Sequence, residues 1–587
     1  MKRLLTFIMV LMCSAAVLLA GVRGENRQEI YPVDSDVYEA IRDLYISEGL
    51  ALPSTTGPWN AAELDLMLSR LSPEEMSVES RAIYDWVCNE ISHDARIETD
   101  GDFGLDIGLR ATAMMYAHTD SEHFSSLDSF GGRGDIREQL PMLQIPLATW
   151  IGRHVYGYSS FDIGISRTFI NGLEKSPLFT NLFMVPPSTM ADLNLNFPSR
   201  AVGSFGGENW NVAIGRDRMK WGPGESGNLI IGDQLPHHDN ARFTAFSNRF
   251  KYTFSMSSFI HPQNYMKTDT AGKDWFEPLY DMRPERKGLS MLISHRLEWR
   301  IIDRINMALT ESIRYQSSDG SIDWMVLSPT AVFHNYYIRG NANSIISLEM
   351  DFTPMKYLNI YGEMAIDEFK LPGEFDKGKP GPPTAIGFIL GAKTSVPIGQ
   401  GMLTAHLEGA YTDPYLYLRD DGASYGSDRY GINFIAAMSE WVSADGKPNY
   451  TQEFIGYRYG NDSVVAEFGV GYKVYGKWFI DGRYTYIADG CFDENTRWAR
   501  AVEKSDADPS APSTDHPAQG SFDRNSNWED RDAVQHWNVL SITGGVTLLD
   551  DLDIWGELNY INIQNFGNVS GQTASDLQFV LGVSYYI

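Results

Sequence analysis

The sequence lacks any long apolar run apart from the one between Leu4 and Ala20. A membrane-spanning helix needs roughly 20 consecutive apolar residues, so a bundle of such helices is excluded. A chain without them can cross a membrane only as a closed β-barrel, because backbone amides cannot go unpaired in lipid. Cysteine is also scarce. Cys13 lies in the apolar run, and Cys88 and Cys491 lie far apart, which favours neither a disulfide framework nor a metal site.

Positive charge is in short supply as well. Lysine and arginine total 48 against 76 aspartates and glutamates, which gives a formal net charge of −28. Such an excess of negative charge repels nucleic acid, so we expect no nucleic-acid partner, and it predicts acidic, solvated loops.

Signatures of catalysis are missing too. Gly224-Glu225-Ser226-Gly227 lacks the last glycine of a nucleophile elbow, and neither HExxH nor a phosphate-binding loop is present. Pairs of carboxylates say little about a glycosidase in a chain this acidic. His237-His238-Asp239 could bind a metal ion, but adjacent histidines in such a loop are usually solvated. We therefore expect no catalytic residue, no metal site and no cofactor.

The first residues predict export. Lys2 and Arg3 precede the apolar run, and the small residues Val22 and Gly24 follow it, which is the pattern of a secretory signal peptide. We expect residues 1–24 to be that signal, cleaved near Gly24. A retained N-terminal anchor is the alternative.

Residues 25–100 predict a small helical bundle. Asp36 to Glu48 places the apolar residues Val37, Ile41, Leu44 and Tyr45 on one face. Asn60 and Glu63 have the spacing of a capping box, and Ser72-Pro73-Glu74-Glu75 is a second helix start. So little helix is too small for independent stability. We expect it to dock on a larger body and to close its periplasmic mouth.

From residue 103 to Ile587 the hydrophobic period changes to two, with apolar and polar residues alternating. The repetition predicts an all-β membrane protein, an antiparallel outer-membrane β-barrel of about 18 strands over residues 101–587. The strands are expected to start near residues 103, 141, 155, 190, 208, 241, 250, 289, 305, 345, 357, 385, 402, 463, 477, 537, 553 and 577.

The connections between these strands alternate in length. Short ones, such as Asp303-Arg304, should face the periplasm, and long ones, such as 412–462, should face outside. The segment 501–532 is rich in Asp, Ser, Pro and Asn and should be mobile. Tyr585 and Tyr586 would serve as the signal for the barrel assembly machinery.

Charged residues occupy the faces expected to line the lumen. Arg296, Glu298 and Arg300 alternate with apolar residues, and so do Glu349 and Asp351; Glu363 and Asp367 share the predicted inward parity of Tyr357, Asn359 and Tyr361. One interpretation is a structural ladder of opposite charges between strands. The other is a polar track that binds a hydrophilic ligand.

The segment from Gly215 to Ile231 does not have the pattern of a plain strand. Arg216, Asp217, Arg218 and Lys220 flank Trp221 among several glycines and a proline. An aromatic plate with charged donors is typical of sugar binding, and we expect this loop to face outward or to fold into the lumen. The alternative is a loop that only seals the lumen, with Asp217 paired to an arginine.

This segment resembles the glycine-tryptophan signature of the Wzi-type capsule assembly proteins. Further similar motifs follow in the family's order and cover nearly the whole mature chain: His295-Arg296-Leu297, Leu309-Thr310-Glu311, Gly340 to Asn343, Tyr361-Gly362-Glu363, Glu408 to Tyr415, and Gly456 to Asp462. The resemblance implies an 18-stranded outer-membrane barrel closed from below by helices, and a lectin that holds capsular polysaccharide. Glu311 departs from it, because it falls on the apolar parity and implies either a bulge or an error in the predicted register.

Three functions remain open. A glycan-binding assembly factor at the cell surface is favoured, with surface or capsular polysaccharide and the lipid bilayer as partners. A diffusion porin is the alternative, and an outer-membrane hydrolase is a lesser one. The closed mouth and the charged lumen favour the first over the second, since a porin gains nothing from a closed mouth.

Overall fold

The computed structural model describes residues 26–92, 97–99, 102–124, 140–163, 200–264, 266–268, 274–276, 287–330, 333, 341–368, 385–419, 432–442, 448–492, 533–549 and 551–587. The predicted signal peptide and the segment 501–532 lie outside these residues. Among the helices of the described part, none is long and apolar enough to cross a membrane.

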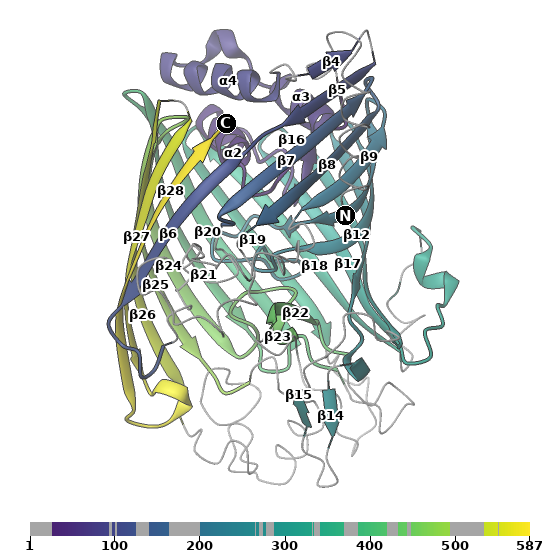
Figure 1. Ribbon diagram of the computed structural model, residues 1–587, viewed down its shortest axis with the longest axis vertical. Coiled ribbons are helices and arrows are strands. Elements are labelled where there is room, and N and C mark those ends of the chain that lie inside the picture. Colours follow the sequence, from purple (N-terminus) through teal and green to yellow (C-terminus); the bar gives the residue numbers. More distant parts are fainter. Residues whose placement is uncertain are drawn as a thin grey trace, which may run out of the picture.

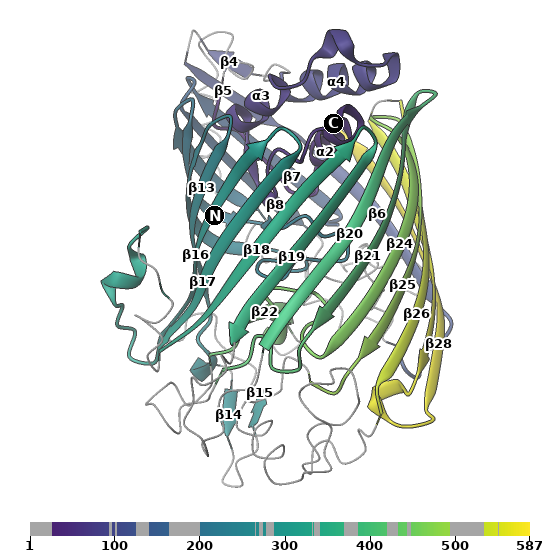
Figure 2. The same ribbon diagram turned by 180° about the vertical axis from the view of Figure 1, so that it is seen from behind.

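The described residues form a closed antiparallel barrel with 18 strand positions (Figures 1 and 2). Its strands are β5 (Phe103–Ile107), β6 (Arg110–His118), β7 (Leu143–Ile151), β8 (Val155–Ile163), β9 (Ala201–Gly206), β10 (Trp210–Asp217), β12 (His238–Phe246), β13 (Phe250–Phe259), β16 (Leu289–Ile302), β17 (Ile305–Ser317), β18 (Ala342–Met355), β19 (Leu358–Glu368), β20 (Ala385–Ile398), β21 (Gly401–Thr412), β24 (Ser463–Val474), β25 (Trp478–Asp489), β26 (Gln535–Leu548), β27 (Leu552–Gln564) and β28 (Thr573–Tyr586). Because β5 and β6 both pair with β7, they share one position.

The ring closes where β28 pairs with β6. β4 (Ile97–Thr99) extends the sheet beside β5. Four two-stranded sheets stand apart from the ring: β1 (Ile30–Tyr31) with β3 (Trp59–Asn60), β2 (Thr56–Gly57) with β11 (Lys220–Trp221), β14 (Met266–Thr268) with β15 (Asp274–Phe276), and β22 (Ile435–Val442) with β23 (Pro448–Phe454). The predicted strand count is confirmed, and so are most of the starts. The strand expected near 190 is instead described from Ala201, and residue 190 itself lies outside the described residues.

Side chains along each strand alternate between an exposed outer face and a buried inner face. On β16, Leu297 and Trp299 are 37% and 51% exposed, whereas Arg296 and Glu298 between them are 1% and 3% exposed. Apolar side chains therefore form the outer face of the barrel, and charged ones point inward. An apolar outside on a closed barrel can lie only against lipid, which places the protein in the bacterial outer membrane.

Aromatic side chains ring the end of the barrel that carries the short turns. The exposed members of this ring are Phe205, Trp210, Phe250, Trp299, Tyr357, Trp478 and Tyr585. Such rings mark a membrane–water interface. Tyr357 corrects a prediction, because it does not point into the lumen. It sits in the turn after β18 with a φ of 74°, and its side chain is exposed.

Glu311 overturns a second expectation. The ladder between β17 and its neighbours runs past Glu311 without a register shift, so no bulge is present there. Glu311 keeps the outward parity, and its carboxylate accepts a hydrogen bond of 3.0 Å from the backbone N–H of Phe333. A segment of the connection after β17 thus covers this polar group on the outer wall.

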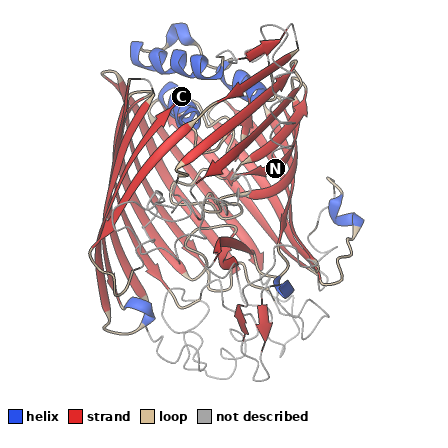
Figure 3. Cartoon of the chain, viewed as in Figure 1, coloured by secondary structure: helices blue, strands red, loops and turns tan. Residues whose placement is uncertain are grey.

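Three helices gather at the end with the short turns (Figure 3). They are α2 (Asp36–Glu48), α3 (Ala61–Leu68) and α4 (Val78–Ile91). The 3-10 turns are η2 (Pro73–Glu75), η4 (Pro262–Asn264), η5 (Trp324–Leu327) and η6 (Phe566–Asn568). Residues 26–92, which we call the N-terminal plug, are thus helical where the sequence predicted helices. The assignment of this end to the periplasm stays a prediction.

Local signals account for the bounds of α2 and α3. Ser35 caps α2, and Gly49 ends it at a φ of 79°, a left-handed conformation that glycine adopts without a steric penalty. The predicted capping box of Asn60 and Glu63 is present at the start of α3. The third helix begins later than predicted, because Pro73 to Glu75 form only a 3-10 turn and Ser77 caps α4 instead.

Candidate functional site

The N-terminal plug is bound inside the mouth of the barrel by hydrogen bonds to charged groups. Asp43 of α2 accepts hydrogen bonds from the hydroxyls of Ser395 (2.8 Å) and Tyr475 (2.7 Å) on the barrel. Lys473 of β24 lies 2.7 Å from Asp36 and 2.6 Å from Glu39. The apolar face of α2 packs in a cluster that includes the barrel residues Met402 and Tyr475. The plug and the barrel therefore share one core.

The charged ladder predicted on β16 and β18 holds the segment after α2. The backbone N–H of Leu52 donates to Asp351 (2.7 Å), and the hydroxyl of Thr55 donates to Glu349 (3.0 Å). The guanidinium of Arg300 donates to the carbonyl of Leu52 at 3.3 Å. The chain itself thus occupies positions that a ligand would take.

Arg296 is the centre of this ladder. Its guanidinium donates to Glu298 (3.1 Å), to Glu349, and to Thr310 (2.9 Å). A buried charge is tolerated only when it is paired and hydrogen-bonded in this way. The geometry matches the structural interpretation of Arg296, Glu298 and Arg300, and ligand binding by these three residues stays a prediction without support from their contacts.

Glu363 and Asp367 of β19 bind two other segments that lie in the lumen. Glu363 accepts a hydrogen bond of 2.9 Å from the backbone N–H of Leu229, and Asp367 accepts one of 3.0 Å from that of Tyr417. The carboxylate of Glu408 on β21 likewise accepts hydrogen bonds from the backbone N–H groups of Glu225 and Ser226, each at 2.8 Å. Inward carboxylates therefore bind backbone amides of chain folded into the lumen.

The segment 218–235, which we call the lumenal loop, folds into the barrel between β10 and β12. Trp221 is fully buried, pairs with Thr56 of the plug, and packs with Leu229 and Ile231. No stacking face of Trp221 is open to a sugar. Asp217 is buried beside Arg200, with a hydrogen bond of 2.9 Å from that guanidinium. Both contacts match the alternative of a sealing loop.

Trp221→Ala should therefore loosen the lumenal loop. Removing a fully buried aromatic side chain costs about 3–5 kcal/mol, and here the loss falls on the packing between the loop and the plug. We expect faster proteolysis within the loop and a lower denaturation midpoint in detergent. Trp299→Ala is the matched control, since Trp299 faces lipid and its loss leaves the lumen intact. Equal behaviour of the two variants would contradict the sealing role.

The side chain of Arg216 does not point into the lumen. It shares the outward parity of Ile214, and its guanidinium donates to Asp239 at 2.7 and 2.9 Å. His238 beside it is also not a solvated loop residue as expected, because its ring is buried at the start of β12. In the part of the chain that the structure describes, no group of three His, Cys, Asp or Glu side chains could hold a metal ion.

Cationic side chains do converge at one point of the lumenal loop. Asp233 lies 2.7 Å from Arg458 and 3.4 Å from Lys220, and Arg218 donates to the Asp233 carbonyl at 2.7 Å. The side chains of Lys220, Asp233 and Arg458 are each 22–24% exposed, so solvent reaches them. We call Arg218, Lys220, Asp233 and Arg458 the cationic cluster.

Electrostatics within the cationic cluster favour the ionised form of Asp233. Burial alone would raise the pKa of this carboxyl, but Lys220, Arg458 and Arg218 hold the pKa well below its usual range. The Asp233 carboxylate thus pairs with two cations, Lys220 and Arg458, while Arg218 binds the backbone carbonyl of the same residue. Arg458 was not among the predicted ligand residues, although the motif Gly456 to Asp462 contains it and only the fold brings it to Asp233.

Similarity to one solved structure supports the fold. Wzi, an outer membrane protein involved in group 1 capsule assembly in Escherichia coli and described as a carbohydrate binding β-barrel, is 13% identical with a TM-score of 0.54. The match covers 94% of this chain and 98% of that one. The outer membrane channel DcaP of Acinetobacter baumannii is 10% identical with a TM-score of 0.33, over 84% of this chain and 100% of that one.

No protein-family model matches the sequence, and no curated protein matches it. The similarity to solved structures is low in identity and therefore concerns the fold alone. What the comparisons and the geometry establish together is an outer-membrane β-barrel of 18 strand positions with an N-terminal helical part in one mouth.

Proposed function

We propose that this protein binds surface or capsular polysaccharide at the outer membrane and assists its assembly or attachment there. The observation that carries the proposal is the cationic cluster, in which Arg218, Lys220 and Arg458 meet at a solvent-accessible point in a protein of net charge −28. Guanidinium groups bind carboxylates and hydroxyls through charge-assisted hydrogen bonds. An acidic polysaccharide is the ligand that fits these groups.

Two further features support this proposal. Tyr459 is partly exposed next to Arg458 and stands edge-on to Tyr457 at 5.5 Å, so an aromatic ring lies beside the cationic donors. The similarity to Wzi, which is described as a carbohydrate binding β-barrel, also favours glycan binding. Arg216 is not part of the proposed site, because it lies on the outer face of β10 and its guanidinium binds Asp239.

Retention of polygalacturonate on purified protein tests the proposal. Loss of a charge-assisted hydrogen bond costs on the order of 1.5–3 kcal/mol, so Arg218→Ala and Arg458→Ala should each weaken retention about tenfold or more. Arg153→Ala is the matched control, an exposed arginine in the turn between β7 and β8. Retention equal to that of the control in well-folded variants would sink the proposal.

One observation favours a diffusion channel as the second candidate. Asp481, Arg483, Ser541 and Thr543 lie on the inward parity of β25 and β26 and are only partly buried. Water therefore reaches lumenal side chains on that wall, in contrast to the filled region beside β16 to β21. Conductance measurements separate the two candidates.

A further inference from the structure

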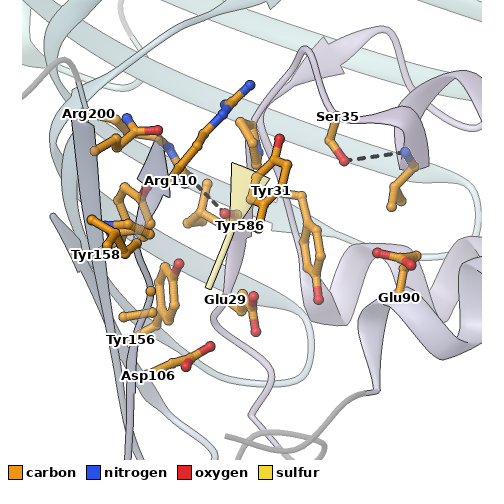
Figure 4. A pocket seen from close by; sticks show the side chains of 18 of the residues that line it. Glu29, Tyr31, Ser35, Glu90, Asp106, Arg110, Tyr156, Tyr158, Arg200 and Tyr586 are labelled. Atoms are coloured by element: carbon orange, nitrogen blue, oxygen red, sulfur yellow. Dashed lines mark hydrogen bonds between the residues drawn. The ribbon is translucent and has the colours of Figure 1, made fainter. Parts of the chain in front are cut away.

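Polar side chains of the barrel wall are covered by other segments of the chain. On the inner face the plug provides this cover at one point, where Arg200 donates a hydrogen bond of 2.7 Å to the carbonyl of Ile30. Figure 4 shows Tyr158 and Arg200 on the barrel side of a cavity of about 450 Å³, and Tyr31 and Ser35 on its plug side. The outer face needs such cover even more, because lipid offers no hydrogen-bond partner to a polar group.

One stretch of the outer face is covered by the connection after β17. Residues 318–330 and 333, which we call the side arm, contain the turn η5, and this teal turn stands outside the barrel wall in both Figures 1 and 2. Val326 and Phe333 of the side arm are buried and pack with Ile293 and Ile313. Both isoleucines lie on the outward parity of β16 and β17. The side arm is therefore docked on the outside of the barrel.

Polar groups of the outer wall lie beneath the side arm. The hydroxyl of Tyr252 on β13 donates a hydrogen bond to the carbonyl of Pro329. Glu311 accepts its hydrogen bond from the backbone of Phe333, and the ring centre of His295 lies 4.7 Å from that of Phe333. The side arm thus takes the place of lipid over these three side chains.

The covered wall lies at the depth of the membrane. At a rise of about 3.4 Å per residue and a tilt of about 40°, an apolar band about 25 Å tall spans roughly ten strand residues. On β20 the exposed apolar residues extend over such a length, from Ile398 to Phe388. On β16, Trp299 belongs to the aromatic ring at the end with the short turns, and His295 falls well within that length.

The backbone of the side arm is hydrogen-bonded within the chain. The N–H groups of Ser321 and Met325 donate to side chains of preceding aspartates at 2.8 and 3.0 Å. Those of Val326 and Ser328 donate to backbone carbonyls of the same turn at 3.1 and 3.2 Å. A loop in water can leave such groups to the solvent, whereas backbone groups beside lipid need partners within the protein.

The outermost surface of the side arm is apolar. Trp324 and Met325 are 77% and 54% exposed, and the apolar wall continues next to the arm at the exposed Leu309. Tryptophan is enriched where a membrane meets water. Asp323 beside Trp324 is exposed as well, which suits the headgroup level rather than the hydrocarbon core. This surface is thus continuous with the lipid-facing wall and has the composition of an interfacial segment.

We propose that the side arm is a lipid-binding element of the barrel. Trp324 and Met325 insert at the interface of the leaflet that lies at the end with the long connections, and the arm shields Tyr252, His295 and Glu311 from the lipid below. The partner of this surface is the lipid itself. The inference goes beyond glycan binding and does not depend on it.

Fluorescence of a site-specific label in dioleoylphosphatidylcholine vesicles tests the inference. The dye NBD is attached to Met325→Cys in a Cys88→Ser background, in which the remaining Cys491 is buried. We expect nitroxide-labelled phosphatidylcholine to quench this dye about as strongly as the same dye on Leu309→Cys, a lipid-facing position. Iodide on both sides of the membrane should quench it several-fold less than the dye on Val78→Cys, which is exposed on the plug.

Trp324→Cys provides a second labelling site, which should respond in the same way and keeps the test decisive if labelled Met325→Cys fails to fold. Absence of quenching by the nitroxide lipid at both positions overturns the inference. It does so whether iodide reaches the dye, as in an arm surrounded by water, or does not, as under a cover of protein. Retention of polygalacturonate by the labelled proteins should be unchanged, so a failure of the proposed function is seen separately.

Discussion

Deletion of residues 30–95 should raise the single-channel conductance of the barrel several-fold in planar bilayers. The plug lies in the mouth of the barrel, and its segment 51–56 binds the lumenal charges of β16 and β18. Without the plug, Asp351, Glu349 and Arg296 would face water instead of backbone amides and carbonyls. Hydrated charges along a wide lumen favour the passage of ions, so the current should rise.

We expect the lumenal loop to limit this increase, because it lies in the lumen against the plug segment around Thr56. Asp217 and His238 are direct partners in the ladder of β10 and β12, so a short turn can replace the loop between them. Deleting the plug and the loop together should give a larger conductance than deleting the plug alone. Three deletion variants are compared, lacking the plug, the loop, or both, each refolded and checked for heat-modifiable migration on gels.

Val78→Ser is the control for any effect of purification and reconstitution on the conductance. Val78 is 84% exposed at the start of α4, so this change leaves the plug docked and the conductance as it was. Equal conductance with and without residues 30–95 would contradict the closing role of the plug. A high conductance of the unaltered protein would favour the diffusion channel over the glycan-binding function.

The elements predicted from the sequence are those whose signals are local. The bounds of α2 follow from one apolar face and from caps within a few residues, and the capping box at Asn60 needs only Glu63 three positions later. The strands were predictable because lipid outside and water or protein inside impose a strict period of two. Pro73 misled the prediction of α4, since a proline at a helix start fits a 3-10 turn equally well.

The role of the lumenal charges could not be predicted in the same way. Thr55 and Glu349 are 294 positions apart, and nothing in either neighbourhood marks them as partners. The alternation placed Arg296, Glu298 and Glu363 correctly in the lumen, but it could not tell a ligand from a folded segment of the same chain. For the same reason Arg218 was identified as a candidate while Arg458, brought to Asp233 only by the fold, was not.

Arg296→Ala should destabilise the protein more than any other single substitution in the charged ladder of β16 and β18. Breaking a buried charge pair by removing one partner costs about 3–5 kcal/mol, because the remaining charge is left uncompensated. Glu298 and Glu349 are both buried beside Arg296, so two carboxylates would lose their cation. Denaturant titration in detergent, followed by tryptophan fluorescence, measures the change in unfolding free energy.

Two further variants identify the cause of that loss. Arg304→Ala is the matched control, an exposed arginine in the turn between β16 and β17 whose guanidinium donates to the carbonyl of Pro354, and surface changes of this kind usually stay within about 0.5 kcal/mol. Adding Glu298→Gln and Glu349→Gln to Arg296→Met should recover much of the stability, because no uncompensated charge then remains at these three positions. If Arg296→Ala is no more destabilising than Arg304→Ala, the ladder does not hold the plug, and its charged side chains become candidates for ligand contact again.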